Sequence, residues 1–106
     1  MVQTTNKNIK LVKDFKKRLT KHGIIRLILF GSRARGTFDS ESDFDIIAVS
    51  ERFKDVKWHK RPLSLYLAWD EDYPVDFLCY TPEEFEKKKK QAGIIQQAVK
   101  EGIEIK

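Results

Sequence analysis

Residues 27–50 read LILFGSRARGTFDSESDFDIIAVS, two apolar runs joined by a turn and a polar loop. The first run predicts a buried strand that ends at the tight turn Gly31-Ser32. Ten residues later, Asp43-Phe44-Asp45 opens the second run, which predicts a second strand. Because side chains alternate faces along a strand, Asp43 and Asp45 are expected on one face and Phe44 on the other. Two carboxylates therefore share a face at the start of an otherwise apolar strand.

Aligned carboxylates are costly without a cation, because unit charges about 5 Å apart repel by about 3 kcal/mol at an effective dielectric constant of about 20. A third acid, Asp76, lies in another strand-like run, residues 73–80. Neighbouring strands lie about 4.8 Å apart, so Asp76 joins Asp43 and Asp45 if its strand pairs beside theirs. Oxygen ligands without a nearby His or Cys favour Mg²⁺ or Mn²⁺ over Zn²⁺. The alternative is that these acids only cap turns, where Asp is common.

The Gly31-Ser32 turn predicts a phosphate-binding site. Its backbone amides and hydroxyl, followed by Arg33 and Arg35, offer donors that suit a triphosphate. The alternatives are an ordinary turn and, for the two arginines, plain surface charge. The pattern GxxxxGK[ST] is absent from the sequence, so the turn is not a Walker A loop. A phosphate-binding turn beside a metal site indicates phosphoryl or nucleotidyl transfer.

Gly31-Ser32 followed after ten residues by Asp43-x-Asp45 resembles the signature of the DNA polymerase β-type nucleotidyltransferase superfamily. The strings GSRARG and SDFD, in so short a chain, most resemble the minimal nucleotidyltransferases (MNT), many of which are antitoxins paired with a HEPN-domain toxin. The resemblance implies an α/β fold with a small mixed sheet flanked by helices. It also implies that Ser32 and the Gly31 backbone hold the β- and γ-phosphates of an NTP. Asp43 and Asp45 would bind two Mg²⁺ ions, and Asp76 would complete the site that activates the acceptor hydroxyl.

The function implied by this resemblance is transfer of NMP, AMP from ATP, to a hydroxyl acceptor on a partner HEPN toxin, which the modification would silence. Two alternatives stay open. One is a non-catalytic antitoxin that neutralises its partner by binding, against which the intact acids argue. The other is modification of a small hydroxylated molecule, against which the lack of a substrate-binding domain argues. The acceptor site is accordingly expected on another chain or on a second copy of this one.

Composition indicates one domain over residues 1–106, because chains of this size seldom divide. The net charge of +5 suits an anionic partner, whether an NTP, an acidic protein or nucleic acid. Nucleic acid is not required, because Glu–Lys pairs spaced i,i+4 account for most of the Lys87–Lys90 run. The single cysteine, Cys79, excludes an internal disulfide and is expected to be a buried apolar residue of a cytoplasmic protein. No apolar run reaches the length of a membrane span.

The remaining pattern predicts the elements around this unit. Helices are expected over residues 6–22, 33–36, 58–70, 82–90 and 94–102, and strands over residues 24–30, 42–50, 73–80 and 103–105. Gly23 is placed to end the first helix, and Thr81-Pro82-Glu83-Glu84 matches a capping box. Residues 58–69 carry more large apolar side chains than a short helix can bury, which predicts a protein partner or a homodimer.

Overall fold

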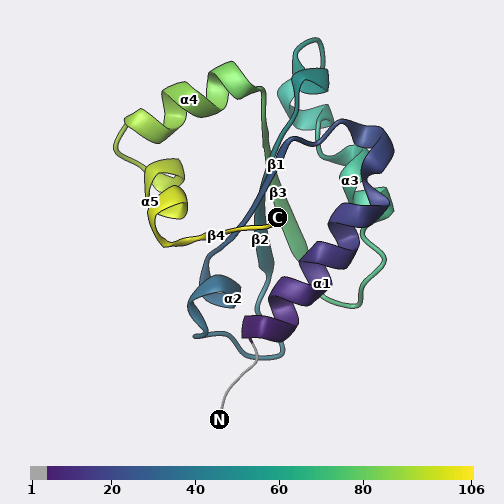
Figure 1. Cartoon of the computed structure of the whole chain (residues 1–106), viewed down its shortest axis with the longest axis vertical. Helices are drawn as coiled ribbons and strands as arrows, with labels where there is room; N and C mark the ends of the chain where they lie inside the picture. Colours follow the sequence, from purple (N-terminus) through teal and green to yellow (C-terminus); the bar gives the residue numbers. More distant parts are fainter. Residues whose placement is uncertain (1–4) are drawn as a thin grey trace.

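A four-stranded mixed sheet forms the centre of the computed structural model, which describes residues 5–106 apart from the side chain of Thr20 (Figure 1). Its strands are β1 (Arg26–Phe30), β2 (Phe44–Val49), β3 (Val75–Tyr80) and β4 (Ile103–Glu104). They lie in the order β3-β2-β1-β4, with β2 and β3 parallel and the other pairs antiparallel. The predicted α/β class with a small mixed sheet is confirmed.

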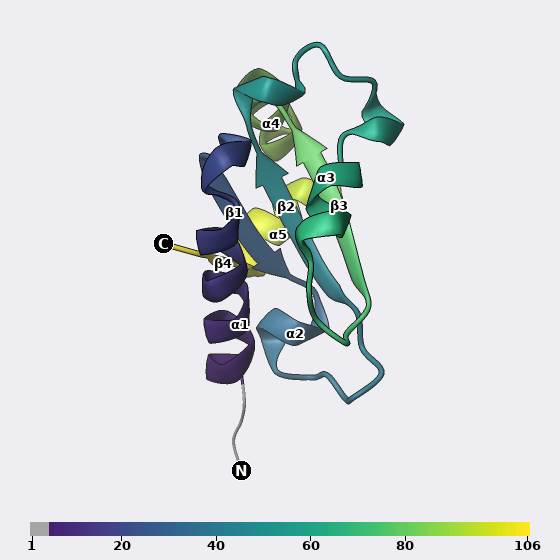
Figure 2. The ribbon, with the colours of Figure 1, turned by 90° about the vertical axis from the view of Figure 1, so that its right-hand side faces the viewer.

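Helices α1 (Thr5–Arg18) and α3 (Leu63–Ala68) cover one face of the sheet, and they lie in front of it in Figure 2. The apolar residues of α1 recur at helical spacing, so one side of the helix is buried against the strands. The core on this face includes Val12, Phe15, Leu27, Leu29, Phe44, Ile46, Leu65, Phe77 and Cys79. Cys79 is buried in this core, as predicted.

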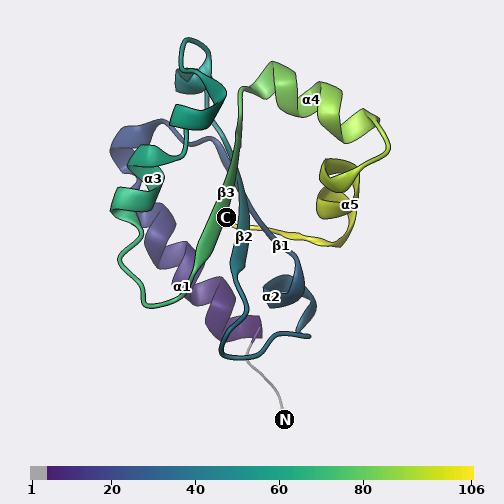
Figure 3. The same ribbon diagram turned by 180° about the vertical axis from the view of Figure 1, so that it is seen from behind.

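Helices α4 (Pro82–Lys90) and α5 (Ile94–Glu101) cover the opposite face, and Figure 3 shows them on the other side of the strands from α1 and α3. The capping box is confirmed, because the Thr81 hydroxyl accepts from the Glu84 amide at 3.2 Å and the Glu84 carboxylate accepts from the Thr81 amide at 2.9 Å. The core on this face includes Ile28, Ile47, Val49, Tyr80, Phe85, Ile95 and Ala98.

Strand β4 brings the end of α5 against β1. Leu29 and Ile103 are register partners. Gly102, which connects α5 to β4, packs directly on the β1 backbone. A Cβ on Gly102 would lie 2.4 Å from the Ala98 carbonyl oxygen and 2.8 Å from that of Leu29, so no side chain fits there. The short edge strand expected near residue 103 is thus confirmed, and it fixes α5 beside the end of β1.

The predicted helix over residues 58–70 is wrong in its extent. The chain forms a 3₁₀ turn over Trp58–Lys60, and α3 begins only after Pro62. Proline has no amide hydrogen and cannot continue a helix, so it separates the two segments. The first helix likewise ends at Arg18, and a 3₁₀ turn over Thr20–His22 leads to Gly23, whose φ of 65° confirms the left-handed end.

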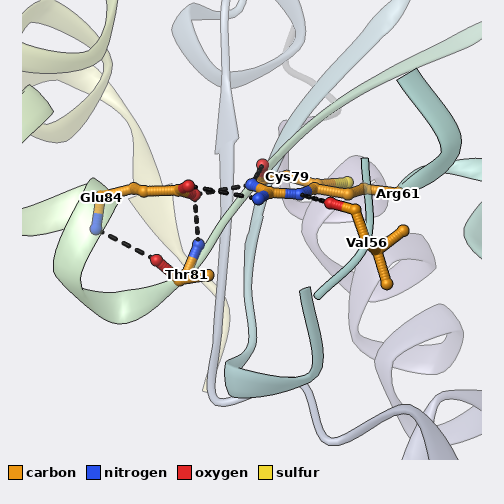
Figure 4. Close-up of polar contacts among 5 residues, drawn as sticks. All are labelled: Val56, Arg61, Cys79, Thr81 and Glu84. Atoms are coloured by element: carbon orange, nitrogen blue, oxygen red, sulfur yellow. Dashed lines mark hydrogen bonds and ion pairs between the residues drawn. The ribbon is translucent and has the colours of Figure 1, made fainter. Parts of the chain in front are cut away.

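A buried arginine braces the end of the sheet near the C-terminus of β3 (Figure 4). Arg61 is only 8% exposed and donates to both carboxylate oxygens of Glu84, at 2.6 and 3.2 Å. It also donates to the carbonyl oxygens of Val56, at 2.9 Å, and Cys79, at 3.2 Å. The guanidinium thereby joins the loop after β2 to the first turn of α4.

Within residues 5–106, no helix has both the length and the apolar character needed to cross a membrane.

Candidate active site

The predicted acids lie where β2 and β3 begin. Asp45 and Asp76 are register partners in the parallel pair, so the strand of Asp76 pairs beside that of Asp45 as expected. Asp43 comes one residue before β2 and is exposed, like Asp76, whereas Asp45 is partly buried. Phe44 packs into the core beneath α1 and Ile47 into the core beneath α5. Asp45 therefore faces the α5 side of the sheet, because neighbours in a strand point to opposite faces.

The Gly31 turn lies directly against the Asp45 carboxylate. Phe30 is the register partner of Asp45 across the antiparallel pair, so the chain leaves β1 beside this acid. Gly31 has a φ of 76°, a conformation that side chains disfavour. A Cβ at this position would lie 2.4 Å from Asp45 Oδ2. Glycine is thus required both by the turn and by the contact with the acid.

Helix α2 (Ser32–Arg35) begins immediately after this turn and ends at Gly36, whose φ is 85°. The amides of Ala34 and Arg35 both donate to the Gly31 carbonyl oxygen at 3.1 Å, which fixes the turn. Ser32 is partly buried at the first position of the helix, and Arg35 is exposed. Both therefore lie near the acids, where the sequence predicted phosphate binding.

The electrostatics of the acids favour a cation. Burial raises the pKa of the Asp45 carboxyl, and the negative charges of Asp76 and Asp43 raise it further, while Arg35 lowers it. Within residues 5–106, no three His, Cys, Asp or Glu side chains are already gathered in a geometry that could hold a metal ion. The donors present are carboxylates at one end of the sheet, which suits Mg²⁺ or Mn²⁺ in chemical type.

The structure corrects the expectation for Arg33. Its side chain is 4% exposed, and its Nε and Nη2 atoms donate to the Ser42 carbonyl oxygen at 3.2 and 3.0 Å. Its guanidinium lies 4.5 Å from the Phe44 ring centroid and 4.8 Å from that of Tyr73. Phe44 and Asp45 point to opposite faces, so Arg33 lies across the sheet from the acids. Arg33 supports the fold, and phosphate binding remains a prediction for Gly31, Ser32 and Arg35.

A cavity of about 230 Å³ opens between the turn and α5. It is lined by Phe30, Gly31, Arg35, Asp45, Ile94, Gln97, Ala98 and Glu101. The sequence motif does not reveal the α5 residues of this wall, because they lie about fifty residues beyond Asp45. The signal that could have found them is the edge strand near residue 103, since its pairing with β1 brings α5 to Gly31.

Comparison with known proteins gives the family of this chain and several relatives. The family model described as nucleotidyltransferase domain matches residues 9–105. The candidate protein adenylyltransferase MJ0141 of Methanocaldococcus jannaschii is 28% identical over 100 residues, which make up 92% of this chain and 97% of that protein.

Solved structures show the same fold. A crystal structure of a candidate nucleotidyltransferase from Sulfolobus solfataricus superposes with a TM-score of 0.64 at 20% identity, covering 94% of this chain and 80% of that chain. A crystal structure of a toxin–antitoxin with AMP-PNP superposes with a TM-score of 0.50 at 25% identity, covering 98% of this chain and 73% of that chain. The chain therefore belongs to the nucleotidyltransferase domain family, the enzyme class that the Gly31-Ser32 and Asp43-x-Asp45 motif predicted.

Proposed function

We propose that this protein is a metal-dependent nucleotidyltransferase that transfers AMP from ATP to a hydroxyl group of a partner protein. The observation that carries the proposal is the meeting of three parts at one end of the sheet: the Gly31 turn, Asp45 and Asp76. Two of the comparisons support the finer assignment. The archaeal relative is named as a candidate protein adenylyltransferase, and a toxin–antitoxin of similar fold contains AMP-PNP.

Each part has its own role in this proposal. The Gly31 backbone lets phosphates approach Asp45 closely, and the Ser32 hydroxyl donates to a phosphate oxygen. The exposed Arg35 guanidinium neutralises phosphate charge beside the same acid. Two Mg²⁺ ions held by Asp43, Asp45 and Asp76 would offset the triphosphate charge and lower the pKa of the acceptor hydroxyl. Asp76, exposed on β3, accepts the proton of that hydroxyl as it attacks the α-phosphate and pyrophosphate leaves.

The partner would be a HEPN-domain toxin, and the apolar surface of the α3 region is the place where we expect it to bind. Trp58 is 48% exposed, Leu63 56% and Leu67 88%, so residues 58–67 carry several of the exposed large apolar side chains of the described residues. Exposed apolar side chains grouped on one short segment mark a protein-binding surface. The same surface also serves the alternative in which the partner is neutralised by binding alone.

The test is to incubate the protein with labelled ATP, Mg²⁺ and the protein encoded by the adjacent open reading frame. We expect label on the partner and release of pyrophosphate. Asp76→Asn should reduce transfer by about two orders of magnitude, the scale of lost acid–base assistance, while Mg·ATP binding changes only a few-fold. Asp43→Asn should impair both. A tight complex that never becomes labelled would favour the binding-only antitoxin and overturn the catalytic proposal.

A further inference from the structure

The cavity between the Gly31 turn and α5 has a wall that phosphate and metal chemistry do not explain. Asp45 and Arg35 line it, and so do Ile94, Gln97 and Glu101 of α5. We propose that this cavity binds the nucleoside part of the nucleotide and that these three α5 side chains recognise it. The inference rests on the proposed function, because it places the rest of the nucleotide whose phosphates lie at Asp45.

The size of the cavity fits part of a nucleotide. Pockets that enclose a whole drug-sized ligand measure about 300–1,000 Å³. The cavity measures about 230 Å³, so it holds a nucleoside portion and leaves the triphosphate outside, toward Asp43 and Asp45. Because Gly31 and Arg35 line the cavity together with Asp45, a nucleotide can lie with its phosphates beside these residues and its base against α5.

The α5 wall offers the groups that a nucleoside needs. Ile94, Gln97 and Glu101 lie three and four residues apart, so they share one face of the helix. Ile94 is 63% exposed, although its neighbour Ile95 is buried in the core. An apolar side chain at the mouth of a cavity gives a flat base a surface on which to pack.

Gln97 and Glu101 of this wall are hydrogen-bonded to each other, and each keeps a further acceptor atom. Gln97 Nε2 donates to Glu101 Oε2 at 2.6 Å. The amide oxygen of Gln97 and the second oxygen of Glu101 can still accept from a base amino group or a ribose hydroxyl. Glu101 would repel phosphate, so its place in this cavity suits the uncharged part of the ligand.

The wall is held in position before any ligand arrives. Ile95 and Ala98 anchor α5 in the core, and Gly102 packs on the β1 backbone only two residues before Gly31. Leu29 pairs with Ile103, which fixes the end of the helix. A preformed wall reduces the cost of ordering the site on binding.

The sheet order separates this cavity from the acceptor. The cavity lies on the β1 and β4 side of Asp45, whereas Asp76 lies on β3, at the other edge of the sheet. A nucleotide that enters from the β4 side leaves the β3 side open for the attacking hydroxyl. The cavity therefore suits the nucleoside and not the acceptor side chain.

The experiment compares binding of Mg·ATP with binding of Mg·tripolyphosphate by calorimetry. We expect ATP to bind about tenfold more tightly, the effect of one or two added hydrogen bonds with apolar contact. Ile94→Ala combined with Gln97→Ala should remove this advantage and leave tripolyphosphate affinity unchanged. The matched controls are Val99→Ala and Gln96→Ala, exposed positions of α5 that do not line the cavity. Both controls should bind ATP as the wild type does.

The outcomes separate this inference from the proposed function. If wild type binds ATP no better than tripolyphosphate, or if the double variant keeps full ATP affinity, the assignment of the cavity is overturned and the proposed function still stands. Transfer that falls in the double variant without a change in ATP affinity would assign the cavity to the acceptor instead. If neither ATP nor tripolyphosphate binds, the proposed function fails together with the inference. The melting temperature of the double variant, compared with that of the wild type and of the two control variants, checks that the effect is not a folding defect.

Discussion

Asp45 and Asp76 lie side by side as register partners of β2 and β3, with no described basic side chain between them in the sheet. The pKa of Asp45 is raised by burial, by Asp76 and by Asp43, so the folded state holds this proton more tightly than the unfolded chain does. Its ionisation at neutral pH therefore costs folding free energy, and the cost disappears once the pH falls below the ordinary carboxyl range. Charge repulsion therefore destabilises the folded site at neutral pH.

The first prediction follows from this repulsion. Asp45→Asn should raise the free energy of unfolding in metal-free buffer at pH 7 by on the order of 1 kcal/mol, because one of the facing charges is removed. Mg²⁺ should raise the melting temperature of wild type and have little effect on the variant. Thermal unfolding with EDTA and with Mg²⁺ measures both. Asp55→Asn, at an exposed acid of the loop after β2, is the control and should show neither effect.

The contact between Gly31 and Asp45 gives a second prediction. Gly31→Ala should abolish nucleotide binding, because its Cβ would lie 2.4 Å from Asp45 Oδ2 and displace that carboxylate. Gly36→Ala is the control for a methyl group added at a positive φ, since its φ is 85° and its Cβ would meet only Thr5 Oγ1, at 3.3 Å. Gly36→Ala should lose about 1–2 kcal/mol of stability, and Gly31→Ala more, because a φ of 76° with a ψ of −160° is a conformation that essentially only glycine adopts. Equal Mg·ATP affinity in the two variants, measured by calorimetry, would contradict this interpretation.

The third prediction separates the two arginines of α2. Arg33→Ala should destabilise the fold by about 3 kcal/mol, because it removes a buried cation with several hydrogen bonds. Arg35→Ala, at an exposed position, should change stability by less than about 0.5 kcal/mol. It should nevertheless weaken ATP binding about tenfold, as expected for a lost charge-assisted hydrogen bond. Urea unfolding and calorimetry measure these effects, and a destabilising Arg35→Ala would argue against the assignment.

The brace between Arg61 and Glu84 gives a prediction about pH. The Arg61 hydrogen bond lowers the pKa of Glu84 below its ordinary value of 4.5. The pair therefore stabilises the fold fully above pH 4.5, and its contribution is lost as the pH falls from there through the lowered pKa of the folded state. Glu84→Gln should cost about 1 kcal/mol at pH 7, since the carboxylate is partly exposed. The difference from wild type should shrink below pH 4.5 in urea titrations. Glu83→Gln, next along the same turn and outside the brace, should show no such trend.

The strand, turn and cap signals of this chain are local, which is why the sequence predicts them well. Gly23, Gly31-Ser32, the capping box at Thr81 and the strand of Asp76 all lie where expected. Each depends on residues within a few positions of one another, and hydrophobic alternation determines the strands. Asp76 joins the other acids only if β3 pairs with β2, and the structure has this pairing.

The side of the sheet that each arginine reaches cannot be predicted from the residues next to it in the sequence. Residues two apart on a helix point about 200° away from each other, so Arg33 and Arg35 cannot both face the acids. Which one does depends on where α2 packs, and the Arg33 contacts with Ser42 and Tyr73 come from distant segments. The cavity wall on α5 was missed for the same reason, because only β4 brings it to Gly31.

The pairing of β4 with β1 also bears on how the protein folds. It joins Ile28 to Glu104, the register pair most distant in sequence, whereas β1 and β2 are joined by a connection of thirteen residues, 31–43. Contacts between distant segments are slow to form because the loop between them must close first. A two-residue strand also opens at lower free energy than the central strands do. The last part of the sheet to assemble thus carries one wall of the nucleotide cavity, and a nucleotide bound there would favour the completed fold by mass action.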